Sequence, residues 1–312
     1  MISNKILSQH QVTINGFDNK PISIDTIRLN TTKFNCCKVI IFSHGFKGFK
    51  DWGPFNEIAK FFAKSGYTFV KFNFSHNGTT VNDSKNFVDL EAFGNNNFSK
   101  ELYDLGCVID WVYNSFKLDH QEDYFFSNSD KFKKPKVFLL GHSRGGSISI
   151  LKSSEDTRIS SVVSWASPSD LLSKILLNET IKKWKENNVT YIYNSRTKQN
   201  MPLYYQFVED CSKSKEKLDV RLALKKIKIP HLQIHGDLDT TVSVQSAFDM
   251  KSWNTNTNIH IIKDADHVFN VSHPYNLKEF PKHLEEALVT TCLLYTSPSP
   301  RDVRSSRMPS SA

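Results

Sequence analysis

Apolar runs and amphipathic stretches alternate along the chain from residue 37 to residue 264. Short runs rich in Val, Ile and Phe predict buried strands, and the amphipathic stretches between them predict helices. The predicted strands are 37–45, 67–74, 136–140, 159–166, 229–236 and 258–264, and the predicted helices are 55–66, 100–116, 144–154 and 244–253. This alternation predicts an α/β fold with a mostly parallel central sheet and helices on both faces. The first 30 residues predict a leading antiparallel hairpin.

The size and composition fit one globular domain with an insertion. The 312 residues are 39% hydrophobic and 23% charged, which is ordinary for a soluble protein. The N-terminus lacks the apolar core of a signal peptide, and no stretch approaches eighteen apolar residues, so we expect a cytoplasmic protein without a membrane span. The five cysteines form neither a C-x-x-C pair nor a metal-ligand spacing, and their odd number argues against a disulfide framework.

The net charge of +8 raises the question of a nucleic-acid partner. The densest basic runs are KFKKPK at 131–136 and KKIKIP at 225–230. Both lead into predicted strands and neither matches a nucleic-acid-binding motif, so solvated loops explain them. We expect no nucleic-acid partner. The composition does not indicate whether the protein is a monomer or an oligomer.

Residues 293–312 (LLYTSPSPRDVRSSRMPSSA) differ in composition from the rest of the chain. They contain no Asn, Lys, Ile or Phe, and they carry three of the eight arginines. The segment resembles translated sequencing-adapter sequence, and a genuine disordered tail is the alternative. We expect a non-native or disordered tail that contributes nothing to the core, after a domain at 1–292. The preceding PKHLEEALVTT predicts a final helix.

About sixty residues without the strand and helix rhythm separate the strands at 159–166 and 229–236. An insertion of this length is more often functional than a simple connection. We expect a helical lid at about 168–225, although aromatic residues at irregular spacing also fill small cores. Its aromatic residues are Trp184, Tyr191, Tyr193, Tyr204, Tyr205 and Phe207.

The run KVFLLGHSRGGSISI places Ser143 at a turn between a predicted strand and a predicted helix. Gly141, Ser143 and Gly145 match G-x-S-x-G, the nucleophile elbow, in which a strained turn exposes the serine hydroxyl. An ordinary glycine-rich turn is the alternative. A serine hydroxyl is a weak nucleophile at neutral pH, so this serine needs a base and an acid that orients the base.

Candidates for both partners lie in loops after later predicted strands. HGDLDTTV offers Asp237 and Asp239 as the acid, and DADHVFN offers His267 as the base, with His273 as the fallback. The chain order of serine, acid and histidine is the order found in elbow-type hydrolases. Each candidate follows the carboxyl end of its own strand, where open parallel sheets place their sites.

Five segments in order resemble an α/β-hydrolase-fold serine hydrolase of the esterase, serine-aminopeptidase-like or dienelactone-hydrolase-like branch. They are SHGFKGFKDWG, FNFSHNG, GHSRGG, HGDLD and DADHVF, and the resemblance covers residues 35 to 290. It implies Asp239 as the acid, because the second aspartate of H-G-D-x-D takes that role. It also implies an oxyanion hole made by the backbone N–H groups of Phe46 and Arg144. The Arg144 side chain has two interpretations: contact with an anionic substrate, or a structural ion pair.

These residues predict a hydrolase that cleaves a carboxylic ester through an acyl-enzyme on Ser143, with His267 as base and no cofactor or metal. The substrate is a small ester or a short peptide. An aminopeptidase, amidase or thioesterase would use the same machinery. A ligand-binding protein without turnover is the alternative of another class, because this fold also hosts such proteins.

Overall fold

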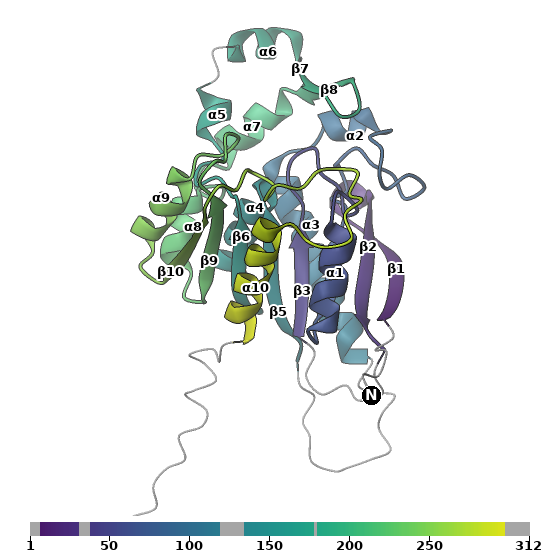
Figure 1. Ribbon diagram of the computed structural model, residues 1–312. Coiled ribbons are helices and arrows are strands. Elements are labelled where there is room, and N and C mark those ends of the chain that lie inside the picture. Colours follow the sequence, from purple (N-terminus) through teal and green to yellow (C-terminus); the bar gives the residue numbers. More distant parts are fainter. Residues whose placement is uncertain (1–6, 31–37, 119–133, 178–179, 297–312) are drawn as a thin grey trace, which may run out of the picture.

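The structure is a computed structural model that describes residues 7–30, 38–118, 134–177 and 180–296. Within these ranges eight strands form one sheet in the order β1-β2-β4-β3-β5-β6-β9-β10 (Figure 1). β2 is antiparallel to β1 and β4, and every other neighbouring pair is parallel. The leading hairpin and the mostly parallel sheet are therefore confirmed. The strands of this sheet are β1 (Leu7–Asn15), β2 (Pro21–Leu29), β3 (Lys38–Ser43), β4 (Thr68–Phe72), β5 (Lys136–His142), β6 (Ile159–Trp165), β9 (His231–Gly236) and β10 (Thr257–Ile262).

Helices cover both faces of this sheet. α1 (Phe55–Lys64) and α10 (Lys282–Thr296) pack on one face, and α3 (Phe98–Leu118), α4 (Arg144–Glu155) and α8 (Val220–Lys226) pack on the other. α9 (Gln245–Trp253) lies beside β10. Among the described residues, no helix combines the length and the apolar character that a membrane span requires.

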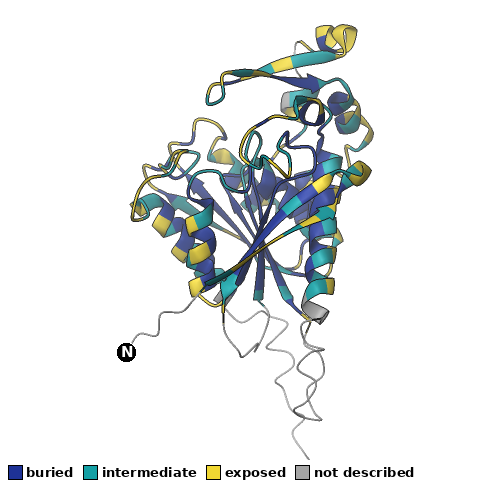
Figure 2. Cartoon of the chain, turned by 90° about the vertical axis from the view of Figure 1, so that its right-hand side faces the viewer, coloured by how far each residue is buried: buried dark blue, intermediate teal, exposed yellow. Residues whose placement is uncertain are grey.

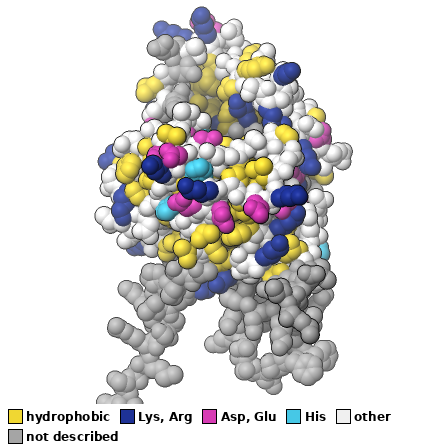
Figure 3. All heavy atoms as spheres, in the orientation of Figure 1, with side chains coloured by type: hydrophobic (Ala, Val, Ile, Leu, Met, Phe, Trp, Pro, Cys, Tyr) yellow, Lys and Arg dark blue, Asp and Glu magenta, His cyan; other side chains and the backbone are white. Residues whose placement is uncertain are grey.

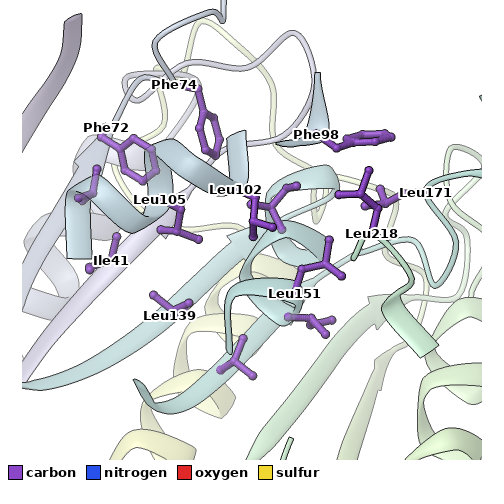
Figure 4. Packing of buried hydrophobic residues seen from close by; sticks show 14 of the residues in the cluster. Ile41, Phe72, Phe74, Phe98, Leu102, Leu105, Leu139, Leu151, Leu171 and Leu218 are labelled. Atoms are coloured by element: carbon purple, nitrogen blue, oxygen red, sulfur yellow. The ribbon is translucent and has the colours of Figure 1, made fainter. Parts of the chain in front are cut away.

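β3 and β5 carry apolar side chains on both faces, because both faces of the sheet are buried there (Figure 2). Along β3, Val39 and Ile41 join one core cluster, while Ile40 and Phe42 join the cluster on the other face. This is the two-residue period of a strand with helices on either side. Figure 4 shows the first cluster, in which side chains of the sheet and of α3 and α4 meet residues of the insertion. The labelled residues are Ile41, Phe72, Phe74, Phe98, Leu102, Leu105, Leu139, Leu151, Leu171 and Leu218.

The sequence predicts a helical insertion, but the insertion contains strands as well as helices. It holds the short helices α5 (Ser173–Leu176), α6 (Ile181–Asn187) and α7 (Gln206–Lys213), and also an antiparallel pair, β7 (Val189–Asn194) with β8 (Gln199–Tyr204). Each strand is only six residues long, and Tyr191 and Tyr193 on β7 are exposed. The pair is held by α6, because Trp184 is buried and donates its Nε1–H to Leu203 O at 2.8 Å.

The last part of the expected lid belongs to the main domain. α8 packs against α4 through Val220, Ala223 and Leu224, an apolar stripe of helical spacing. Its first turn is capped by Asp219, whose side chain accepts a hydrogen bond from Leu222 N at 3.0 Å. The remainder of the insertion stands above the carboxyl ends of the strands, together with α2 (Leu90–Gly94).

The final helix runs further than the composition suggested. α10 continues to Thr296, so residues 293–296 of the expected tail are helical. Tyr295 is buried and donates its hydroxyl to Leu139 O at 2.7 Å. Leu294 and Tyr295 continue the helix and pack against the core, whereas Leu293 is exposed. Composition alone did not indicate this packing. Residues 297–312 of the tail lie outside the described residues, as do residues 1–6, Cys36, Cys37 and residues 131–133 of the first lysine run.

Charged side chains of both signs are interspersed on the face seen in Figure 3, and no single sign dominates it. The same view shows hydrophobic side chains in a hollow below the upper part of the insertion. The hollow lies on the side of the molecule toward which the carboxyl ends of the parallel strands point.

Candidate active site

Ser143 occupies a strained turn between β5 and α4. Its φ of 55° and ψ of −126° lie outside the regions that non-glycine residues usually adopt. Its N–H donates to Trp165 O at 2.7 Å, which ties the turn to the neighbouring strand β6. A Cβ on Gly145 would lie 2.2 Å from Ser43 O, so only glycine allows this approach. The geometry is that of the predicted elbow.

Asp239 and His267 meet at the same edge of the sheet. His267 Nδ1 lies 2.7 Å from Asp239 Oδ2. Asp239 Oδ1 accepts the N–H groups of Thr241 and Val242, each at 2.8 Å. Burial alone would raise the pKa of Asp239, but hydrogen bonds from His235, His267 and Val242 N–H lower it well below its usual range. The carboxylate therefore stays ionised and holds His267 through Nδ1.

The two alternative residues have other partners. Asp237 is exposed, and its Oδ1 accepts Asp264 N–H at 2.7 Å, which stabilises the turn. His273 accepts Gly53 N–H on its Nδ1 at 2.9 Å. Its ring also packs against Phe49, with the ring centroids 5.2 Å apart. Neither residue takes part in the Asp239–His267 pair.

His142, which directly precedes Ser143, contacts the loop that carries His267. His142 Nε2 lies 2.9 Å from His267 O, and the two rings are 5.0 Å apart between centroids. Burial lowers the pKa of His142 to about 3, so the ring is neutral at neutral pH. The hydrogen bonds among the described residues do not include one between Ser143 Oγ and His267. In a ligand-free site this contact is often long and closes when substrate binds.

The Phe46 N–H is directed by the carbonyl of its own peptide unit. Gly45 O accepts Gly48 N–H at 3.0 Å and lies 2.9 Å from His44 Nδ1. Burial lowers the pKa of His44 to about 4, so the neutral ring donates from Nδ1. The carbonyl and N–H of a trans peptide point in opposite directions. Phe46 N–H is thus aimed away from these groups, and it has no hydrogen-bond partner among the described residues.

The same logic applies to Arg144 N–H. Ser143 O accepts Gly146 N–H at 3.0 Å in the first turn of α4, so the N–H of the same peptide unit points out of the helix N-terminus. It too has no hydrogen-bond partner within the described ranges. A Cβ on Gly45 would lie 2.9 Å from Ser143 Cβ and 3.5 Å from Ser143 Oγ, so the two loops that carry these amides lie against each other.

Of the two interpretations of the Arg144 side chain, the structure shows the structural ion pair. Its Nη1 lies 3.3 Å from Glu101 Oε1, and its guanidinium stands over the Phe46 ring at 4.0 Å from the centroid. Phe98 and Phe207 lie near the same group, at 4.9 and 5.5 Å. Phe207 belongs to α7, so this cation links the insertion to the Phe46 loop.

Sequence reasoning missed three residues that surround the site. Glu101 neutralises Arg144, His142 contacts the His267 loop, and His235 lies 3.2 Å from Asp239 Oδ2 through its Nε2. His142 and His235 lie within the quoted motifs GHSRGG and HGDLD, but nothing in these motifs indicates their contacts with the pair. Glu101 lies in a separate helix, and nothing in its local sequence indicates the pairing.

Comparisons with known proteins agree on the architecture. No protein-family model matches the chain, and no curated protein matches it by sequence. Solved structures do match, among them Est1E from Butyrivibrio proteoclasticus, with a TM-score of 0.63 at 15% identity over 91% of this chain and 98% of that chain. A dienelactone hydrolase from Anabaena variabilis gives 0.56 at 14% identity over 93% and 97%. An acylaminoacyl peptidase from Pyrococcus horikoshii gives 0.63 at 15% identity over 96% of this chain and 44% of that one.

Proposed function

We infer the chemistry of this chain from its own residues, because the solved structures that it resembles support its α/β-hydrolase fold alone. We propose that the protein is a serine hydrolase that cleaves carboxylic esters through an acyl-enzyme on Ser143. The observation that carries this proposal is the Asp239–His267 pair at 2.7 Å, in the loops beside a strained serine turn.

The proposed reaction begins when His267 Nε2 takes the Ser143 hydroxyl proton and Oγ attacks the ester carbonyl carbon. The carbonyl oxygen becomes an oxyanion, for which Phe46 N–H and Arg144 N–H are the available donors. Collapse of this intermediate releases the alcohol, which receives the proton from His267. Water, deprotonated by His267, then attacks the acyl carbonyl carbon, and collapse of this second intermediate breaks the bond to Oγ and releases the carboxylic acid. His267 returns the proton to Ser143 Oγ. Asp239 orients His267 and stabilises the imidazolium formed in each half-reaction.

We assign the insertion a role as a lid over this site. Its support is its position above the carboxyl ends of the strands and the packing of Phe207 near Arg144. The Arg144 charge is met by Glu101, so we do not assign it to an anionic substrate. An apolar acyl group suits the hydrophobic hollow below the insertion.

Kinetics on two substrate series test the proposal. The wild-type protein and Ser143→Ala are assayed on p-nitrophenyl esters of increasing acyl length and on aminoacyl anilides. We expect ester turnover with a burst of p-nitrophenol in the wild type, and a loss of about 10⁴-fold or more in the variant. Faster anilide turnover would favour a peptidase. Equal ester rates in both proteins would remove Ser143 from the mechanism.

A further inference from the structure

One face of β9 is polar although it is fully buried. His231, Gln233 and His235 alternate with Leu232 and Ile234, so their side chains lie on the same face of the sheet. All three are 0% exposed. Buried polar side chains are retained only where hydrogen bonds compensate their desolvation. This polar stripe of β9 ends beside the Asp239 carboxylate.

The stripe forms a connected chain of hydrogen bonds. His231 Nδ1 lies 3.0 Å from Thr257 Oγ1 on β10, and His231 Nε2 lies 2.8 Å from Ser164 Oγ on β6. The Ser164 hydroxyl contacts the Gln233 amide, whose other end lies 2.9 Å from His235 Nδ1. The chain therefore crosses β10, β9 and β6 and ends at His235.

Two backbone groups fix the orientation of the Gln233 amide. Ser167 N–H can only donate and lies 3.0 Å from one end of the amide, closer than the acceptor Ser167 O at 3.3 Å, so this end is assigned as the oxygen. Ser164 O can only accept, and it lies 3.1 Å from the other end, which is therefore the nitrogen. The amide oxygen also faces His235 Nδ1, so this ring nitrogen has to carry a proton.

The second ring nitrogen of His235 also faces only acceptors. His235 Nε2 lies 2.9 Å from Val242 O and 3.2 Å from Asp239 Oδ2. A nitrogen between two oxygen acceptors donates, so Nε2 carries a proton as well. Asp239 has a side chain that is 0% exposed, and no Lys or Arg pairs with it among the described residues. A counter-charge stabilises a buried carboxylate further, and His235 is placed to supply it.

We propose that His235 is an imidazolium that positions and neutralises Asp239. Its positive charge limits how strongly this carboxylate stabilises the protonated form of His267. His235 acts through Asp239, so it is a positioning residue, and this role rests on the proposed function. Of the other groups in contact with the pair, His142 faces His267 from β5 and is neutral because burial lowers its pKa to about 3. The Thr241 and Val242 N–H groups complete the partners of the carboxylate.

A charge at His235 has a direct consequence for the working pH. His267 accepts its catalytic proton beside Asp239, and a second cation on the same carboxylate disfavours that protonated form. The His235→Gln variant keeps an amide N–H at a similar position but removes the charge. We expect the acid limb of its kcat/KM profile to move to higher pH by about one unit. A neutral His235 that served only as a hydrogen-bond donor would leave this limb in place.

The control is His260→Gln, which changes a surface histidine of β10 that pairs with Glu286 at 2.8 Å. Its acid limb should coincide with that of the wild type. His235→Leu removes both charge and donor, and its kcat should fall further than that of His235→Gln while KM changes little. An unmoved acid limb in His235→Gln would overturn the proposal.

Nitrogen-15 NMR of the wild-type protein labelled at histidine tests the protonation state without any assay. We expect both His235 ring nitrogens to carry protons from about pH 6 to about pH 8. A bare ring nitrogen at His235 within this range would overturn the proposal even if His235→Gln does not fold. Because this spectrum needs no substrate, it separates failure of the His235 assignment from failure of the proposed hydrolysis.

Discussion

At the residue scale, Asp237 and Asp239 stand two positions apart and have different tasks. Asp239 is buried and holds His267, whereas Asp237 is exposed and accepts Asp264 N–H. A carboxylate that orients a histidine cannot be replaced by an amide without changing the tautomer of the ring. An aspartate that accepts one backbone N–H can be replaced, because the amide oxygen still accepts it.

We therefore expect Asp239→Asn to lower kcat by up to about 10⁴-fold. Asp237→Asn should keep most of the rate and lose about 1 kcal/mol or less of unfolding free energy. Measuring kcat and the urea midpoint for both variants checks this. A rate collapse confined to the Asp237 variant would reverse the assignment of the acid.

Ser143, Asp239 and His267 could be predicted from their order along the chain and from the family resemblance. Contacts between residues that only the fold brings together could not be predicted. Ser143, Asp239 and His267 each follow a predicted strand, so their shared edge could be anticipated. The second histidine on Asp239 could not, because His235 was part of an apparently ordinary buried strand. Its role becomes visible only when the amide of Gln233 and the backbone of β6 are placed around it.

At the element scale, the loop that carries Phe46 is fastened to the sheet by buried charges. Lys50 Nζ lies 2.7 Å from Asp25 Oδ2 and 2.8 Å from Asp51 Oδ2, and Lys71 Nζ lies 2.6 Å from Asp25 Oδ2 and also pairs with Asp51. These four side chains are at most 7% exposed. Removing one charge would leave the others buried with incomplete pairing.

We expect Asp25→Asn to cost about 3–5 kcal/mol of unfolding free energy, since it breaks two buried ion pairs at once. The matched control is Glu57→Gln, which breaks an exposed pair with Lys60 and should cost about 0.5 kcal/mol or less. Urea unfolding measures both. Equal, small losses would show that the buried cluster does not hold this loop.

The C-terminal helix is the element for which composition was misleading. Tyr295 lies in a segment whose residue types differ from the rest, yet its ring is buried and its hydroxyl reaches β5. Tyr295→Phe should cost about 1 kcal/mol through the lost hydrogen bond. Truncation after Cys292 should cost about 3–5 kcal/mol, because it also removes the buried ring.

Thermal unfolding of both proteins, beside a chain that ends at Thr296, measures these losses. An unchanged melting temperature after truncation at Cys292 would support the composition-based expectation and would show that the last turn of α10 does not pack.

The sequence also did not predict the β7–β8 hairpin of the insertion. Its six-residue strands are too short, and too exposed on one face, for a period-two pattern to stand out.

At the scale of the whole molecule, buried neutral histidines control stability in acid. Burial lowers the pKa of His44 and His76 to about 4 and of His142 and His231 to about 3. Their unfolded value is about 6.5. The stability they contribute is therefore present above pH 6.5 and is lost as the pH falls toward 4.

Asp104 opposes this trend, because burial raises its pKa to about 6 and the folded state then binds a proton that the unfolded state releases. The four histidines and Asp104 together give a net uptake of about three protons on unfolding near pH 5. Burial also lowers the pKa of His273, which adds to this uptake, and raises the pKa of Glu101, which reduces it. The slope of unfolding free energy against pH, from urea titrations between about pH 6.5 and about pH 4.5, measures this number. A flat profile in this window would mean that these histidines are not buried as neutral groups.

The overall architecture was the most predictable feature of the molecule. A parallel sheet with helices on its faces requires strands and helices to alternate, and this alternation is visible in the sequence as apolar runs and amphipathic stretches. The mostly parallel sheet and the helices on both of its faces agree with that expectation. The structure of the insertion was less predictable, since its elements pack mainly on one another and on the α2–α3 segment. Long-range contacts of this kind leave little local signal.

The measurement that tests the central claim most directly is covalent labelling with a fluorophosphonate probe followed by peptide mapping. Only an activated serine attacks phosphorus rapidly, so we expect one adduct on Ser143 in the folded wild-type protein. Asp239→Asn should react far more slowly, because His267 is no longer held in the tautomer that accepts the proton. An adduct on another serine, or no adduct on folded protein, would contradict the assignment of Ser143 as the nucleophile.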